Sequence, residues 1–174
     1  MNKQVFKIET IGEAKILSPI QMSINEGDGL ADYVEDSDKI YLNIDHKGRK
    51  NEEEEEVLEL AGPRKKIYFN PSRVHVAICT CGGICPGLNN VIRSVVRCFW
   101  YRYGVRRISG VPFGYLGLLA DSPWPMIELN PDIVDDIQEK GGTILGSARG
   151  GGKEVVQIVD TLERQNINIL ITIG

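Results

Sequence analysis

Three glycine-rich segments carry the groups in this sequence that are best suited to bind an anion. The first is residues 82–87, GGICPG. It offers backbone N–H groups just ahead of an expected helix, and helix N-termini favour phosphate. Leu88 and Asn89 stand where a Walker A loop requires Lys and Ser or Thr, and the Rossmann glycine spacing is absent as well. Residues 82–87 therefore indicate either a structural glycine turn or a phosphate-binding loop without a cation of its own.

The segment 141–152, GGTILGSARGGG, holds six glycines in twelve residues and has Arg149 within it. A guanidinium in such a loop can approach phosphate oxygens and bind two of them at once. A flexible surface loop would not require an arginine among so many glycines just before a helix. A functional role for Arg149 is therefore the favoured interpretation.

Other polar side chains give weaker signals. Arg93 and Arg97 lie four residues apart, so they share one face of an expected helix with Asn89 one turn earlier. For Arg97 we favour an ordinary solvated basic face. His46 lies in a polar segment and His75 within an expected strand, and no nearby nucleophile links them, so both are interpreted as structural.

Three of the four cysteines, Cys79, Cys81 and Cys85, lie close together in the sequence. A finger-type zinc site would need a second pair further along the chain, and only Cys98 is available. Small buried thiols at the end of a strand are therefore the favoured interpretation.

The elements that would position these segments alternate along the second part of the chain. Short apolar runs predict strands at residues 74–78, 107–111 and 167–173. Helices are expected over residues 89–103, from Asn130 and Pro131 to the glycines at 141–142, and after Gly152 around Val155 and Leu162. This alternation predicts an α/β fold, a three-layer Rossmann-like parallel sheet with its glycine loops at the carboxyl ends of the strands.

Composition bounds the remaining possibilities. The 174 residues have a net charge of −4, and residues 71–174 carry ten basic and nine acidic side chains, so nucleic acid is not an expected partner. No apolar run is long enough to span a membrane and no signal peptide is present, so a cytoplasmic protein is expected.

Residues 1–70 are interpreted as a polar extension, in which the acidic run 52–56 begins a solvated helix that stops at Gly62 and Pro63. Residues 71–174 are expected to form the first part of an α/β domain, for which the family resemblance given below implies nucleotide binding.

Together, the glycine segments resemble those of the 6-phosphofructokinase family. Residues 82–93, GGICPGLNNVIR, resemble the family pattern G-G-x-x-P-G-x-N-x-x-I-R. Residues 114–118, GYLGL, resemble its second loop, and residues 141–149, GGTILGSAR, its third. Order and rough spacing match over residues 74–174. The polar extension ahead of the first strand is similar to that of the plant-like, long-chain branch.

The resemblance implies an allosteric, ATP-dependent phosphotransferase of glycolysis that converts fructose 6-phosphate to fructose 1,6-bisphosphate with Mg²⁺, as a homodimer or homotetramer. It places the ATP phosphates at Gly82 and Gly83 and the nucleotide near Tyr115. It further implies that Arg149, with Gly150 adjacent, binds nucleotide phosphate. Arg149 would then also stabilise the charge that develops during transfer.

The family's fourth loop, whose aspartate helps to hold Mg²⁺, would begin at Gly174. The catalytic base and the groups that bind fructose 6-phosphate would lie further on. No catalytic or metal-binding residue is therefore assigned, and the sequence is expected to be a truncated N-terminal part that is inactive by itself. A pyrophosphate-dependent enzyme and a non-catalytic nucleotide-binding relative are the alternatives. An NAD-binding protein is disfavoured because the Rossmann glycine spacing is absent.

Overall fold

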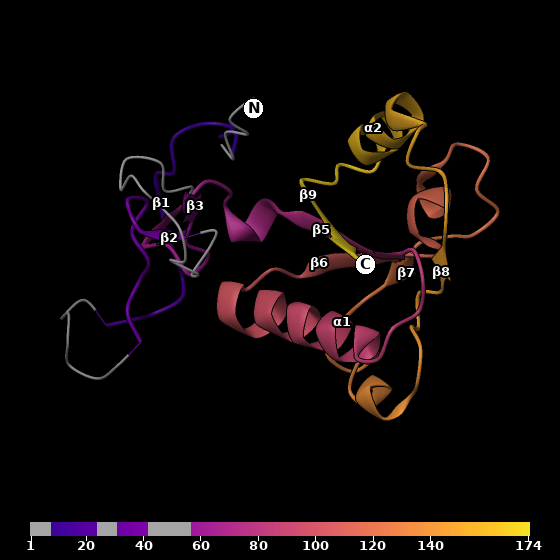
Figure 1. Ribbon diagram of the computed structural model, residues 1–174, viewed down its shortest axis with the longest axis horizontal. Helices are drawn as coiled ribbons and strands as arrows, with labels where there is room; N and C mark the ends of the chain where they lie inside the picture. The colour runs from indigo at the N-terminus through magenta and orange to yellow at the C-terminus, as the bar shows by residue number, and fades with distance from the viewer. Residues whose placement is uncertain (1–7, 24–30, 42–56) are drawn as a thin grey trace, which may run out of the picture. The chain divides into compact units, whose positions relative to one another are not determined.

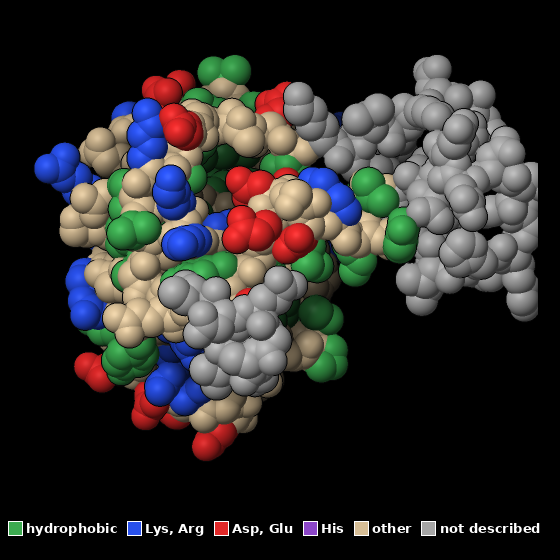
Figure 2. Space-filling view, turned by 90° about the vertical axis from the view of Figure 1, so that its left-hand side faces the viewer, with side chains coloured by type: hydrophobic (Ala, Val, Ile, Leu, Met, Phe, Trp, Pro, Cys, Tyr) green, Lys and Arg blue, Asp and Glu red, His purple; other side chains and the backbone are tan. Residues whose placement is uncertain are grey.

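The structure is a computed structural model that describes residues 8–23, 31–41 and 57–174 (Figure 1). The chain divides into two compact units, Met1–Phe69 and Asn70–Gly174. Acidic, basic and apolar side chains are interspersed on the face seen in Figure 2. Within the described ranges, no helix combines the length and the apolar character needed to cross a membrane.

The described residues of the first unit form two short antiparallel strand pairs. Strand β1 (Ile16–Leu17) pairs with β4 (Lys66–Ile67), and β2 (Lys39–Tyr41) pairs with β3 (Val57–Glu59). The helix predicted from the acidic run is wrong for its second half, because residues 57–59 are extended and bond to a neighbouring strand. The acidic run itself, residues 52–56, lies outside the described residues.

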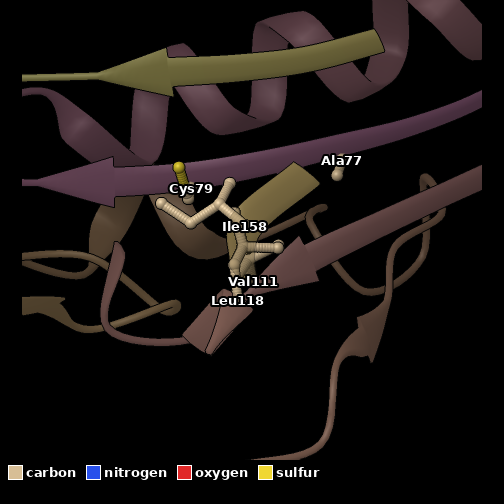
Figure 3. Close-up of a cluster of buried hydrophobic side chains, with 5 residues drawn as sticks. All are labelled: Ala77, Cys79, Val111, Leu118 and Ile158. Carbon is tan, nitrogen blue, oxygen red and sulfur yellow. The ribbon is translucent and has the colours of Figure 1, made fainter. Parts of the chain in front are cut away.

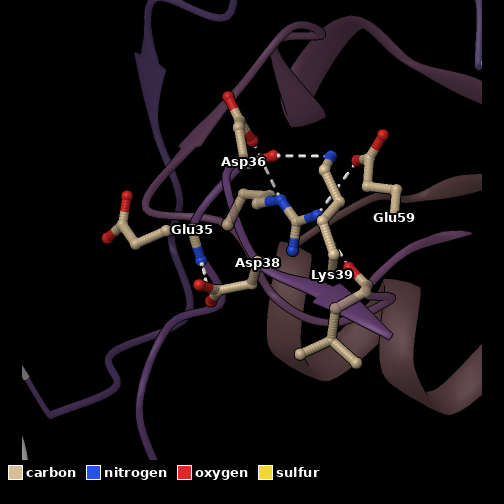
Figure 4. A network of polar contacts seen from close by, with 7 residues as sticks. Glu35, Asp36, Asp38, Lys39 and Glu59 are labelled. Carbon is tan, nitrogen blue, oxygen red and sulfur yellow. Dashed lines mark hydrogen bonds and ion pairs between the residues drawn. The ribbon is translucent and has the colours of Figure 1, made fainter. Parts of the chain in front are cut away.

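Arg64 pairs with acidic residues of two segments of this unit, Asp36 and Glu59, which are labelled in Figure 4. Its Nε lies 3.0 Å from a carboxylate oxygen of Asp36, and its Nη2 lies 3.0 Å from Glu59 Oε1. Nη2 also donates to the backbone oxygen of Leu60 at 2.8 Å. Exposed ion pairs contribute at most about 1 kcal/mol each, but here one guanidinium holds the turn before β2 and the end of β3 at once.

The second unit is built on a parallel sheet with β5 (His75–Cys81) at its centre. Strand β6 (Arg107–Val111) pairs with β5 in parallel, and so does β9 (Ile169–Ile173). The two-residue strand β8 (Ser147–Ala148) runs parallel to the last two residues of β5. This confirms the predicted parallel arrangement. The sequence did not predict the edge strand β7 (Ile127–Glu128), which pairs antiparallel with β6.

Two helices cover opposite faces of this sheet and complete a three-layer α/β fold (Figure 1). Helix α1 (Leu88–Arg97) continues as one π-helical segment, Cys98–Tyr103, and stops at Gly104, whose φ is 73°. The left-handed conformation of Gly104 closes the helix at the predicted position. Helix α2 (Val155–Arg164) follows the third glycine segment, which confirms that prediction too.

The layer between α2 and the sheet is apolar. Ile158 of α2 packs with Ala77 and Cys79 of β5, Val111 of β6 and Leu118 (Figure 3). Burial, together with the nearby Cys81, raises the pKa of the Cys79 thiol to about 12. Cys79 is therefore a neutral thiol at physiological pH and acts as a small core residue.

The helix predicted after Asn130 is wrong. Asn130 does cap a turn, since its Oδ1 accepts from the backbone N–H groups of Asp132 and Ile133, each at 3.0 Å. The turn does not extend into an α-helix, and the segment ends in a short 3₁₀ helix, Ile137–Glu139. Val134 and Ile137 are both buried and lie three residues apart, which is the spacing that a 3₁₀ turn places on one face.

His75 is buried at the start of β5 and has a partner at each ring nitrogen. Nδ1 lies 3.0 Å from the backbone oxygen of Gln165, and Nε2 lies 2.8 Å from Ser109 Oγ. A carbonyl can only accept, so Nδ1 carries the proton of the neutral ring and Nε2 accepts from Ser109. Because both ring nitrogens are engaged within the protein, His75 has the structural role that the sequence predicted. Burial lowers the pKa of this histidine below 6.5, with a smaller contribution from Arg107.

This lowered pKa predicts acid sensitivity. As pH falls through about 6.5, the unfolded chain takes up a proton that the folded chain resists, so stability is present above that pH and is lost below it. We expect the free energy of unfolding to drop between pH 7.5 and 5.5, and to drop less in His75→Gln. Urea titrations at several pH values measure this, with His46→Gln as the control. Equal pH slopes in the wild type and His75→Gln would contradict the assignment.

Candidate functional site

A cleft of about 620 Å³ opens where the three glycine segments meet, beside the carboxyl end of β5. Its walls come from the end of β5, the second loop and the third loop, and are formed by Cys81, Gly82, Tyr115, Leu116, Leu119 and residues 148–154. Four of the five residues predicted to contact the nucleotide line this cleft, and they are Gly82, Tyr115, Arg149 and Gly150. The fifth, Gly83, lies next to it.

Gly82 joins the first loop to the third. Its φ of 82° is in the left-handed region, which glycine adopts at little cost. Its N–H donates to the backbone oxygen of Ala148 at 3.1 Å, and Ser147 Oγ donates to the oxygen of Gly82 at 2.9 Å. The Gly82 amide is therefore already engaged within the protein. In the part of the chain that the structure describes, the next amide, that of Gly83, has no partner and is free to donate.

Arg149 lies over this first loop. A Cβ atom added to Gly83 would sit 3.7 Å from Arg149 Nη2, so the guanidinium and the Gly83 backbone share one small space. Arg149 is exposed, and among the described residues it has neither a hydrogen bond nor an ion pair. The arrangement leaves an uncompensated cation facing a cleft, close to a free amide, which suits a phosphate group.

The second loop supplies the apolar wall. It is a 3₁₀ helix, Gly114–Leu118, which presents Tyr115 and Leu116 to the cleft. The third loop passes very close to it, because a Cβ at Gly151 would lie 3.1 Å from Leu116 and one at Gly152 would lie 3.3 Å from the Tyr115 ring. Glycine at these two positions is what allows the third loop to pass beside Tyr115.

Sequence reasoning missed Lys153. It lines the same cleft and is exposed, and it too has no partner among the residues that the structure describes. The signal was its place four residues after Arg149, at the end of the glycine run. Lys153 adds a second positive charge to the cleft. Glu154 is the one acidic residue among those that line it.

The polar residues of α1 have structural roles. Asn89 is buried, and its Nδ2 donates to the backbone oxygen of Lys140 while its Oδ1 accepts from the N–H of Ile144, both at 2.9 Å. Arg93 and Arg97 converge on one carboxylate oxygen of Asp135, at 3.7 Å and 3.5 Å. Arg97 is therefore paired rather than merely solvated, and neither arginine lines the cleft.

The cysteines differ from one another. Cys79 is buried with its Sγ 3.7 Å from that of Cys81, and Cys81 lines the cleft, as expected for small thiols at a strand end. The expectation of burial is wrong for Cys85, which is exposed, and Cys98, for which no burial was predicted, is exposed as well. The glycine loop turns Cys85 outward, and Cys98 continues the outer surface of α1.

Comparisons with known proteins agree with this arrangement. Residues 75–174 match the family model described as phosphofructokinase. The ATP-dependent 6-phosphofructokinase of Borreliella burgdorferi is 54% identical over 170 residues, which is 97% of this chain and 38% of that protein. ATP-dependent 6-phosphofructokinase 7 of Arabidopsis thaliana is 49% identical over 114 residues, 66% of this chain and 23% of its own.

The fold is also found among solved structures. The crystal structure of Pichia pastoris phosphofructokinase in the T-state aligns with a TM-score of 0.52 at 24% identity, over 70% of this chain and 14% of that chain. That similarity concerns the fold alone. The chain thus spans well under half the length of each of these relatives.

Proposed function

This chain belongs to the phosphofructokinase family, and we propose that it forms the phosphoryl-donor side of an ATP-dependent 6-phosphofructokinase. The full-length protein would transfer the terminal phosphoryl group of ATP to the C1 hydroxyl of fructose 6-phosphate. One observation carries this proposal: Arg149, without a partner among the described residues, lies beside the Gly83 backbone in a cleft lined by glycines.

The chemistry asked of these residues is mainly electrostatic. Phosphoryl transfer depends on positioning and on the stabilisation of charge spread over the phosphate oxygens. Arg149 would bind two of these oxygens, and the Gly83 amide would donate to another. Lys153 would reduce the repulsion between the phosphates and Glu154, which lines the same cleft. The Gly83 amide is held in place by the backbone, whereas the Arg149 and Lys153 side chains, which have no partner among the described residues, would be ordered by the donor phosphates.

The wall of the cleft favours a nucleotide over pyrophosphate as the donor. Pyrophosphate would need only the cations, whereas a nucleoside also needs an apolar surface. Tyr115, Leu116 and Leu119 supply such a surface next to the cations, in a cleft of about 620 Å³. Binding sites for small molecules commonly combine an apolar lining with a few polar groups in this way. A relative that had lost catalysis and nucleotide binding would have no need to keep both the cations and the apolar wall of the cleft.

Mg²⁺ is expected to accompany ATP in this family, but the described residues do not gather a cluster of carboxylates that would hold it. Mg²⁺ prefers oxygen ligands in octahedral geometry. Glu154 is the one carboxylate in the cleft, and no group of three His, Cys, Asp or Glu side chains gathers among the described residues. No step of the proposal is therefore routed through a metal ion on this chain.

The full-length protein is proposed to be a cytoplasmic homo-oligomer that binds ATP and fructose 6-phosphate. The names of two relatives, both ATP-dependent 6-phosphofructokinases, support ATP and fructose 6-phosphate as substrates, whereas the compartment and the assembly rest on the resemblance to the family. One further relative, from Arabidopsis thaliana, is named as chloroplastic. Cell fractionation and light scattering on the full-length protein would test compartment and assembly separately.

Donor assays on the full-length protein test the proposed function. We expect fructose 6-phosphate to be phosphorylated with ATP and not with pyrophosphate. Tyr115→Ala should raise KM for ATP by roughly five- to tenfold with little change in kcat, because an aromatic contact contributes about 0.5–1.5 kcal/mol. Tyr101→Ala, which alters an exposed ring outside the cleft, is the control. Activity with pyrophosphate alone, or an unchanged KM in Tyr115→Ala, would count against ATP as the donor.

A further inference from the structure

Thr80 is a fully buried polar residue next to the cleft, and sequence reasoning gave it no role. Its Oγ1 lies 2.6 Å from the backbone oxygen of Gly146 and 3.1 Å from Thr143 Oγ1. The N–H of Leu145 in turn donates to Thr143 Oγ1 at 3.2 Å. These contacts connect the central strand β5 with the third glycine segment.

The direction of each hydrogen bond follows from the groups involved. The oxygen of Gly146 can only accept, so the single hydroxyl proton of Thr80 goes to it. The proton between the two hydroxyls must then come from Thr143, whose own oxygen accepts from Leu145. The result is one directed chain in which every donor is used, and such buried chains fix the geometry of the groups they join.

The chain of bonds holds the third segment up to the residue before Arg149. Ser147 and Ala148 pair with Thr80 and Cys81 in the sheet, and the Ala148 oxygen accepts from the Gly82 amide. Beyond Ala148 the backbone leaves the extended conformation of the strand and enters the left-handed region, with φ of 100° at Gly150 and 77° at Gly151. Arg149 is the first residue after the fixed part, so its starting direction is set by the segment that Thr80 holds.

We propose that Thr80 is a positioning residue for the donor site, whose hydroxyl fixes the Gly146 carbonyl and thereby aims Arg149 at the donor phosphates. This proposal rests on the proposed function. It assigns Thr80 no contact with the donor. Its effect passes through Arg149, which distinguishes it from a residue that only stabilises the fold.

A variant series in the full-length protein tests this. Thr80→Val keeps the shape and removes the hydroxyl, and it should lower kcat/KM for ATP by on the order of 10- to 100-fold, because small displacements of a positioned group are costly. Thr80→Ser keeps the hydroxyl and should recover activity to within about threefold of the wild type. Thr161→Val is the matched control, because Thr161 is also buried, accepts a hydrogen bond from Arg164 at 3.0 Å and does not line the cleft.

A double-mutant comparison separates positioning from stability. In an Arg149→Ala background, Thr80→Val should cause little further loss, because the group it positions is gone. Independent, multiplicative losses, or a Thr80→Val variant as active as Thr161→Val, would overturn the proposal. If Thr80→Val does not fold, Thr80→Cys takes its place, since a thiol is a weak donor. A wild-type protein without ATP-dependent activity would instead refute the proposed function, so the two failures are distinguishable.

Discussion

Arg149→Ala in the full-length protein should lower kcat/KM for ATP by about 100-fold or more, because a cation that stabilises the charge of the transferring phosphoryl group is lost. Arg149 is suited to this role because it has no partner in the described part of the chain and lies over the Gly83 backbone. The kcat/KM of Arg149→Lys for ATP should lie between those of the wild type and Arg149→Ala. An ammonium group keeps the charge but lacks the fork that binds two oxygens. Steady-state kinetics with ATP varied and fructose 6-phosphate saturating measure the effect.

Arg164→Ala is the matched control for this experiment. Arg164 donates to the backbone oxygen of Asp160 at 3.3 Å and to Thr161 Oγ1, and it lies outside the cleft. Its removal should leave donor kinetics close to those of the wild type. Lys153→Ala should have an effect smaller than that of Arg149→Ala, because an ammonium group lacks the fork with which a guanidinium binds two phosphate oxygens. Unchanged donor kinetics in a correctly folded Arg149→Ala would show that the site has been misplaced.

The sequence was sufficient to predict the parallel sheet formed by β5, β6 and β9. Strand β5 is buried almost throughout, so its apolar run carried a clear signal, and the predicted strand at residues 107–111 has the bounds observed for β6. Gly104 marked the end of the first helix because a left-handed residue was needed there. Four of the five predicted contact residues line one cleft because parallel strands bring the loops at their carboxyl ends together.

What the sequence could not supply depends on contacts between distant segments. The segment after Asn130 has the cap and the proline of a helix, yet it forms turns and a short 3₁₀ helix, with Val134 and Ile137 buried against the rest of the unit. The apolar periodicity of α2 predicted the helix but not which side is covered, since Ile158 is buried while Val156 is 74% exposed. The role of Thr80 depends on a carbonyl 66 residues away, and no local pattern indicates that partner.

Gly117→Ala should destabilise the Asn70–Gly174 unit by about 3 kcal/mol, which is the other large effect that we expect. A Cβ at Gly117 would lie 2.1 Å from the backbone oxygen of Pro112 and 2.8 Å from Val111 Cγ1. The nearest obstacle is backbone rather than the end of a flexible side chain, so the second loop itself must move. The φ of Gly117 is not in the left-handed region, so the lack of space, and not backbone strain, is the cause.

Urea unfolding followed by tryptophan fluorescence measures this change, because both tryptophans, Trp100 and Trp124, belong to the Asn70–Gly174 unit. Gly141→Ala is the control. A Cβ at Gly141 would meet nothing within 4 Å, so this variant should be as stable as the wild type or up to about 1 kcal/mol more stable. If Gly117→Ala unfolds at the same urea concentration as Gly141→Ala, the second loop is not packed as described. Because Gly117 follows Tyr115 by two residues, a loop that moves should also raise KM for ATP, so stability and donor binding are expected to fall together.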